Sequence, residues 1–277
     1  PGSIIEYQIS ATDILGNTAI HPIERTTIKI PKVNPFVREI DLSGIAKEDP
    51  NSEYNNLYWG ASHTASDSQG NLFVVTTVHD RLGNSGKGST VLNKYGPDGL
   101  LVKTFKVDDP GAAPYATTTA HGWDCHAGPY DVALDGQDNI YTTDNCQPEV
   151  HKLTSEGVYI ESYSPQQSGY WQSCNFNSRG LLEIDKNSGA IYLTHDYGGP
   201  GSSGNGYGIL KLDSNGNCDE SASSQLSNGH VSQSIAVDSV GNVYVSDDSG
   251  YQGRSGNNIH KYSSDGTKLA EWGPTGD

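Results

Sequence analysis

The stretch PYDVALDGQDNIYTTD, residues 129–144, contains two apolar segments separated by a polar turn that begins at Asp135. The second segment is rich in β-branched and aromatic residues, which are typical of strands. Two such segments joined by an Asp–Gly turn predict a β-hairpin. The same order of features recurs in SQSIAVDSVGNVYVSDD, residues 232–248, and more loosely in residues 60–78 and 180–196.

Each hairpin is followed by a third predicted strand with Lys before Tyr or Leu: TVLNKY (90–95), EVHKL (149–153), GILKL (208–212) and NIHKY (258–262). A glycine turn leads to a fourth strand, clearest in LLVKTF (100–105), VYIESY (158–163) and KLAEWG (268–273). Each unit is therefore predicted to be a four-stranded meander. The units recur roughly every 50 to 70 residues, slightly above the spacing typical of propeller blades. The predicted fold class is therefore all-β. A β-sandwich is less favoured, because it would not predict the same Asp–turn–aromatic pattern in every unit.

Composition narrows the classes of partner. The 277 residues carry a formal net charge of −16 and have a sequence pI near 4.8. Nucleic acid would be repelled by this charge, so we expect no nucleic-acid partner. We also expect no membrane span, because no apolar run reaches about 20 residues. Tyr, Trp and regularly spaced Val, Ile and Leu supply enough apolar surface for a core.

The hairpins at 129–144 and 232–248, with EVHKLTSEG and NIHKYSSDGTKLAEWG after them, resemble NHL repeats, the blade motif of a usually six-bladed β-propeller. This resemblance implies an NHL-like propeller over residues 57–277. Four blades are visible, so the ring is either incomplete or completed elsewhere. The resemblance is weak for function, because NHL propellers include both binding platforms and enzymes.

Residues 1–33 form a separate predicted unit. They alternate in hydropathy around a turn at Gly16–Asn17 and resemble the last hairpin of the Ig-like modules of prokaryotic surface proteins. Residues 34–56 are expected to be a connector. Two strands alone are marginal in water. The hairpin is expected either to pack on the propeller or an upstream domain, or to complete a sheet on another copy by strand addition.

The four cysteines lack metal-binding spacing, which favours disulfides and an oxidising compartment. Amidating lyases with an NHL-like propeller pair a Cys before the first strand with one after the second. This resemblance implies a Cys125–Cys146 disulfide and leaves Cys174 to pair with Cys218. Those lyases also bind zinc through a His that follows a Pro, whereas Pro129 is followed here by Tyr130 and Asp131. This difference argues against lyase chemistry.

The loops after the second strands and before the first strands are predicted to share one face of the propeller. Candidate metal ligands on this face, for Ca²⁺ or Zn²⁺, are His79, His126, His195 and His230. Candidate ligand-binding residues are Trp123, Trp171, Asp144 and Asp247. The alternative is structural: aspartates after strands cap turns, and aromatic side chains pack between blades.

These features favour a secreted or cell-surface interaction module without enzymatic activity and without a bound cofactor. Expected partners are other protein subunits, including copies of itself, or a carbohydrate bound through Trp123 or Trp171. The sequence has no N-x-[ST] glycosylation site, which favours a prokaryotic cell surface. The alternative is a metal-dependent lyase or hydrolase whose site lies on the loop-rich face.

Overall fold

The repeated hairpins form antiparallel sheets in the computed structural model. It describes residues 10–12, 18–20, 57–80, 88–106, 109–115, 128–164, 180–196, 207–226, 232–247 and 258–273. The chain divides into two compact units, Pro1–Glu39 and Ile40–Asp277. Each unit is described separately below.

The N-terminal unit contains the predicted hairpin. Strands β1 (Ser10–Thr12) and β2 (Thr18–Ile20) pair antiparallel, with Thr12 opposite Thr18. These two short strands form a sheet of their own. The predicted Ig-like character finds no support in them.

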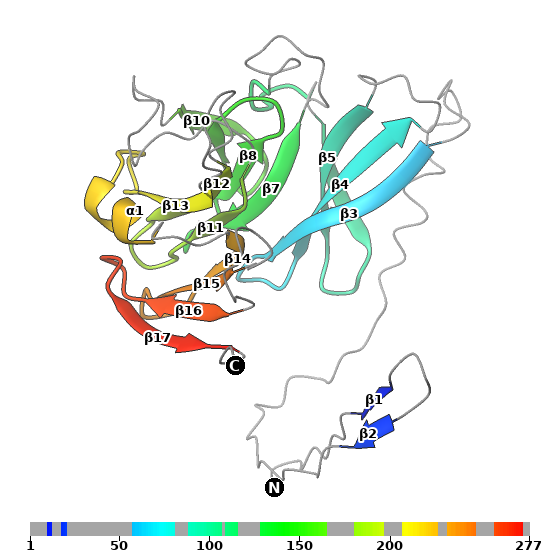
Figure 1. Cartoon of the computed structure of the whole chain (residues 1–277). Helices are drawn as coiled ribbons and strands as arrows, with labels where there is room; N and C mark the ends of the chain where they lie inside the picture. Colours follow the sequence, from blue (N-terminus) through cyan, green and yellow to red (C-terminus); the bar gives the residue numbers. More distant parts are fainter. Residues whose placement is uncertain are drawn as a thin grey trace, which may run out of the picture. The chain divides into compact units, whose positions relative to one another are not determined.

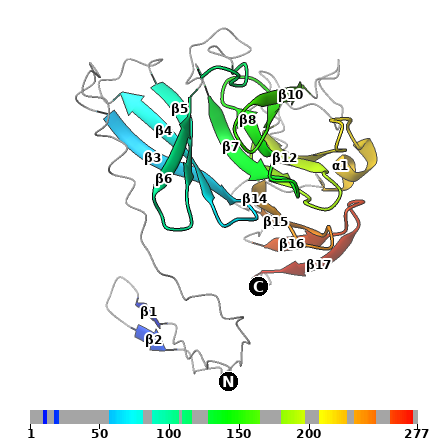
Figure 2. The same cartoon turned by 180° about the vertical axis from the view of Figure 1, so that it is seen from behind.

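The second unit is built from four successive antiparallel sheets (Figures 1 and 2). Within each sheet, strands pair in sequence order, so that each is a meander that resembles a propeller blade. The first sheet consists of β3 (Leu57–Ser66), β4 (Leu72–Asp80), β5 (Gly88–Tyr95) and β6 (Leu101–Phe105). The second consists of β7 (Pro129–Leu134), β8 (Ile140–Asp144), β9 (Val150–Leu153) and β10 (Tyr159–Tyr163).

The third sheet has only β11 (Leu182–Ile184), β12 (Ile191–Asp196) and β13 (Tyr207–Leu212). The fourth has β14 (Ser232–Val237), β15 (Val243–Asp247), β16 (Ile259–Tyr262) and β17 (Lys268–Trp272). The predicted first, second and third strands are thus present in every unit. This arrangement confirms an all-β architecture with blade-like sheets.

The prediction of four strands per unit is wrong for the third sheet, where helix α1 (Glu220–Leu226) follows β13. Asp219 caps this helix, because its Oδ1 accepts a hydrogen bond from Ala222 N at 3.0 Å. Ser223 Oγ accepts a hydrogen bond from Lys211 N at 2.9 Å, so the helix satisfies a donor of β13 that a fourth strand would otherwise bind. In the described part of the chain, no helix is long and apolar enough to cross a membrane.

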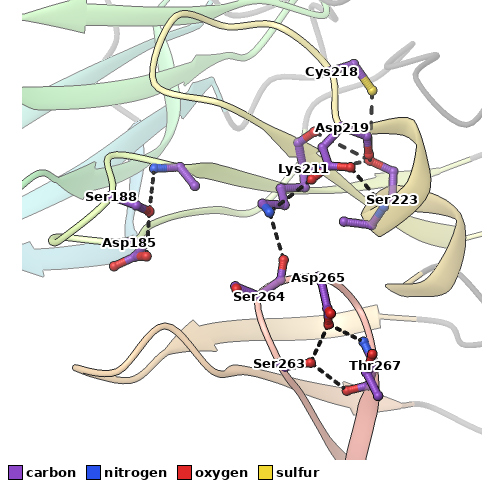
Figure 3. A network of polar contacts seen from close by, with 12 residues as sticks. Asp185, Ser188, Lys211, Cys218, Asp219, Ser223, Ser263, Ser264, Asp265 and Thr267 are labelled. Carbon is purple, nitrogen blue, oxygen red and sulfur yellow. Dashed lines mark hydrogen bonds and ion pairs between the residues drawn. The ribbon is translucent and has the colours of Figure 1, made fainter.

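The hydrophobic core lies between neighbouring sheets. Between the first and second sheets, Phe73, Val75 and Leu92 pack with Val132 and Leu134. A second cluster joins the second and third sheets, and a third joins the third and fourth. Polar bonds support the same junctions. At the last one, Lys211 Nζ donates across the junction to Ser264 O at 2.7 Å, and it also bonds within the third unit to Asp219 Oδ2 at 3.0 Å (Figure 3). The hydrophobic core of this unit is therefore formed by packing between neighbouring sheets.

Candidate functional site

The first strands of the four sheets surround a cavity of about 380 Å³. Strand β3 contacts β7, β7 contacts β11, and β11 contacts β14. Side chains two and four positions before each turn aspartate lie on one face of a strand, because strand side chains alternate. The cavity lining includes such residues: His63, Ala65, Asp131, Ala133, Leu181, Glu183 and Ser234.

A histidine and an aspartate from neighbouring sheets meet in this cavity. His63 Nδ1 lies 3.4 Å from Asp131 Oδ1. Asp131 Oδ2 accepts a hydrogen bond from Leu182 N at 2.8 Å, so the carboxyl also bonds to the third sheet. Burial raises the pKa of Asp131, although His63 and the N–H groups of Leu182 and Val132 oppose this shift. The carboxyl is therefore both fixed in position and poorly solvated.

Glu183 is the second carboxyl of the cavity. Burial, reinforced by the negative charge of Asp131, raises its pKa to about 7. Ile184 N donates to Glu183 Oε1 at 3.2 Å, and Lys186 also lines the cavity. Carboxyls in this state favour a cation or a hydrogen-bond donor as ligand, because a nearby positive charge stabilises the ionised form.

Sequence reasoning missed this site. Its signal was nevertheless present, since aligning the four repeats on Asp67, Asp135, Asp185 and Asp238 places His63, Asp131 and Glu183 at positions that face the same side of the first strands.

Most of the predicted site residues lie where the structure gives no side-chain geometry. His126, His230, Trp123 and Trp171 lie outside the described residues. His79 and His195 lie in β4 and β12, opposite Gly88 and Gly208, and Asp247 ends β15; no side chain is described at these three positions. The predicted cluster of these histidines therefore remains a prediction.

Asp144 is the predicted ligand-binding residue that the structure describes in detail. It is fully buried at the end of β8, and its Oδ1 accepts hydrogen bonds from Cys146 N at 2.6 Å and Gln147 N at 3.2 Å. This is the turn-capping role given above as the alternative. Its Oδ2 lies 3.3 Å from Nε2 of His151, a residue that sequence reasoning did not select.

The described residues include two of the four cysteines, Cys146 and Cys218, and neither is a free thiol. Their predicted partners, Cys125 and Cys174, lie outside the described residues. The predicted pairing is thus compatible with the structure and remains a prediction.

The chain matches no protein-family model and no curated protein sequence. It is similar to several solved structures, all at low identity. A streptogramin B lyase structure has a TM-score of 0.44 and 15% identity, with 80% of this chain and 61% of that chain covered. Virginiamycin B lyase from Staphylococcus aureus has a TM-score of 0.42 and 13% identity, with 79% of this chain and 74% of that chain covered.

A calcium-binding protein, regucalcin from Agrobacterium tumefaciens, has a TM-score of 0.38 and 11% identity, with 69% of this chain and 54% of that chain covered. The chain thus spans less than two thirds of the streptogramin B lyase and regucalcin chains. These matches are a structural similarity to six-bladed β-propellers and concern the fold alone.

Proposed function

We propose that the protein is an extracellular binding module whose central cavity holds a small cationic ligand. The observation that carries this proposal is the pair Asp131 and Glu183, two poorly solvated carboxyls that line one cavity from neighbouring sheets. A bound cation would stabilise both ionised forms, so that binding would release protons near neutral pH.

Isothermal titration calorimetry with Ca²⁺, Mg²⁺ and methylammonium tests this function. Titrations at pH 7 in two buffers of different ionisation enthalpy give both the affinity and the number of protons released. We expect D131N and E183Q to weaken binding by about 10- to 100-fold, the range for a lost charge-assisted hydrogen bond. E156Q changes an exposed turn carboxyl and serves as the control. Binding of none of the probes, or equal binding by D131N and wild type, would contradict the proposal.

We also propose that copies of the chain associate through strand addition by the β1–β2 hairpin. This hairpin is a two-stranded sheet in a unit of its own, and such sheets are marginally stable without a partner. The outer strands β6, β10 and β17 expose apolar side chains, including Leu101, Ile160 and Leu269. A strand of a second copy could pair with such an edge.

Deletion of residues 1–31 tests the association. Light scattering after size exclusion should show a concentration-dependent oligomer for the full chain and a monomer for the truncated chain. An oligomeric state that does not change on deletion would refute strand addition. It would leave the cavity proposal untouched, because the cavity lies in the second unit.

A metal-dependent lyase or hydrolase is the second candidate function. The observation in its favour is Glu183, because a carboxyl with a pKa of about 7 beside the His63–Asp131 pair can both accept and donate a proton at neutral pH. Metal analysis of protein purified without chelator tests the predicted loop site. A stoichiometric transition metal that is lost in an H126A/H230A double variant would favour the enzyme over the binding module.

A further inference from the structure

Three potential metal ligands meet where β8 ends and β9 begins. Carboxylate oxygens of Asp144 and Glu149 and a ring nitrogen of His151 all lie within 4.8 Å of one another. Asp144 and His151 are fully buried, while Glu149 is half-buried and reaches solvent. The connection between the strands is closed by a hydrogen bond from Asp144 N to Glu149 O at 2.9 Å. The backbone therefore brings the two carboxylates together before any ligand binds.

The buried pair is held in an orientation that suits a metal. Asp144 Oδ1 accepts two backbone hydrogen bonds, and its Oδ2 lies 3.3 Å from His151 Nε2. His151 Nδ1 bonds to Ser162 Oγ at 2.7 Å. Metal-ligating histidines almost always donate their other ring N–H to a hydrogen-bond acceptor, which fixes the tautomer and the ring orientation. Ser162 Oγ can serve as that acceptor here. Tyr115 packs edge-on against the imidazole, with ring centroids 4.8 Å apart.

Comparison of the repeats shows what is particular to this position. The residue before the third-strand lysine is polar in three sheets: Asn93, His151 and His260. Each faces a fourth-strand residue across the sheet, Thr104, Ser162 and Glu271 respectively. Across the described ranges, the cluster at Asp144, Glu149 and His151 is the one group with metal-ligand geometry. The third-strand polar residue is thus a feature of the fold. Glu149, two residues before it, is particular to the second sheet, because Val91, Gly208 and Asn258 stand at this position in the other three.

The donor set indicates which cation would fit. Ca²⁺ and Mg²⁺ take oxygen ligands, whereas imidazole together with carboxylates suits Zn²⁺. Three protein ligands leave one position of a tetrahedral zinc site open. We propose that Asp144, Glu149 and His151 form a zinc site that joins the end of β8 to the start of β9. This site is separate from the cavity lined by Asp131 and Glu183, and it uses none of the predicted loop histidines.

Full-length protein, freed of metal by chelation and then dialysed, is titrated with Zn²⁺ by calorimetry and with Co²⁺ by visible absorption. We expect one equivalent of each metal to bind at this site. E149Q and H151N should lose that equivalent. S162A should weaken zinc binding by about 10- to 100-fold, as for other residues that hydrogen-bond to a metal ligand. H151N copies Asn93, which the same register position already accommodates in the first sheet, and E149Q changes a half-buried residue.

H260N is the matched control, because His260 occupies the same register position in the fourth sheet, where Asn258 stands in place of Glu149. It should bind zinc like the wild type. Zn²⁺ should also raise the melting temperature of wild type and H260N but not of E149Q. Unchanged zinc stoichiometry in E149Q and H151N, or an equal loss in H260N, would overturn the proposal. Loss of all zinc in H126A/H230A alone would overturn it as well, by assigning the metal to the loops.

Discussion

The aspartate at the end of each first strand organises its turn through its side chain. In the fourth sheet, Asp238 Oδ1 accepts hydrogen bonds from Val240 N at 3.1 Å and Asn242 N at 2.8 Å. Its Oδ2 accepts one from Asn242 Nδ2 at 2.8 Å and lies 3.6 Å from Lys261 Nζ. That lysine lies 5.0 Å from the ring centre of Tyr244. An aspartate, an aromatic ring and a lysine are linked in this way in the first, second and fourth sheets. In the third sheet, Lys211 instead donates to Asp219 and Ser264.

Replacement of Asn242 with alanine tests this linkage. The side-chain hydrogen bond from Asn242 is the largest influence that lowers the pKa of Asp238, to about 2. N242A should therefore raise this pKa toward the ordinary value, as measured by NMR titration of the carboxyl. A lowered pKa contributes stability that is present above the ordinary value of 3.8 and lost as pH falls toward 2. N242A should lose that contribution at higher pH than the wild type.

Asp265 provides an internal control in the same spectra. Hydrogen bonds from Ser263 and Thr267 lower its pKa to about 2, and none of them involves Asn242. Its titration should not change. A pKa of Asp238 that stays near 2 in N242A would show that the backbone N–H groups alone are sufficient.

Among the elements, the turns that follow the third strands lock one sheet onto the next. Gly157 of the second sheet lies against Phe105, the last residue of β6, and Gly216 of the third lies against Tyr163, the last residue of β10. In the fourth sheet, Gly266 instead meets Ala222 and Gln225 of α1. The helix therefore takes over the role that a fourth strand has in the other sheets.

Alanine at Gly216 should test this packing. A Cβ at this position would lie 2.2 Å from Tyr163 Cδ1, and the φ of +79° adds backbone strain. Gly70 has a φ of +81°, but its nearest neighbour, Pro97 Cγ, would be 3.8 Å from an added Cβ. G70A should thus destabilise by about 1–2 kcal/mol through the backbone alone. G216A should lose a further 1–3 kcal/mol, roughly, through overpacking. Equal free energies of unfolding in urea would contradict the role of Tyr163.

The helix contact is tested by S223A with S224A as its control. Ser223 is fully buried and binds Lys211 N, whereas its neighbour Ser224 is exposed. S223A leaves a strand N–H without its partner and should lower the free energy of unfolding by about 1–3 kcal/mol. S224A should change it by less than about 0.5 kcal/mol. If S223A and S224A unfold alike, the helix does not replace a strand in the way proposed.

The elements themselves were largely predictable from sequence. Alternating residues and Asp–Gly turns predicted the first three strands of every unit, because both signals are local. The same signals are absent after Asn217, where CDESASSQL lacks alternation. There the prediction of a fourth strand depends only on analogy with the other units. The helical signal of this segment is the capping residue Asp219 followed by Ala222, which a strand-based reading overlooks.

At the scale of the whole molecule, the cavity was harder to predict because it depends on how the sheets stack. His63 and Asp131 are far apart in sequence, and only the contact between β3 and β7 brings them within 3.4 Å. Local patterns do not reveal such pairs. Similarly, the place of Asp144 after a predicted strand makes it a candidate from sequence, whereas His151 lies within a predicted strand and carries no such signal.

Stability as a function of pH gives a test of the cavity that requires no ligand. The pKa of Glu183 rises from 4.5 to about 7 on folding, mainly because the carboxyl is buried and also because of the negative charge of Asp131. The folded protein therefore holds this proton more tightly than the unfolded chain. The resulting stability is complete below pH 4.5 and is lost as pH rises through about 7. E183Q has no carboxyl to titrate here, so it does not lose this stability. Between pH 5 and pH 8, the free energy of unfolding of E183Q should therefore rise relative to that of the wild type by up to a few kcal/mol.

Urea unfolding at several pH values measures this difference, with E156Q as the exposed control that should follow the wild type. If the free energies of unfolding of the wild type and E183Q differ by the same amount at every pH, Glu183 is solvated and ionised in the folded protein. At pH 8 the ionised Glu183 carboxylate is destabilised by burial and by Asp131. This would also give the cavity its affinity for a cation, because a bound cation relieves the repulsion between Glu183 and Asp131. Ca²⁺ or methylammonium, whichever binds, should therefore stabilise the wild type more at pH 8 than at pH 5, and E183Q less than the wild type at pH 8.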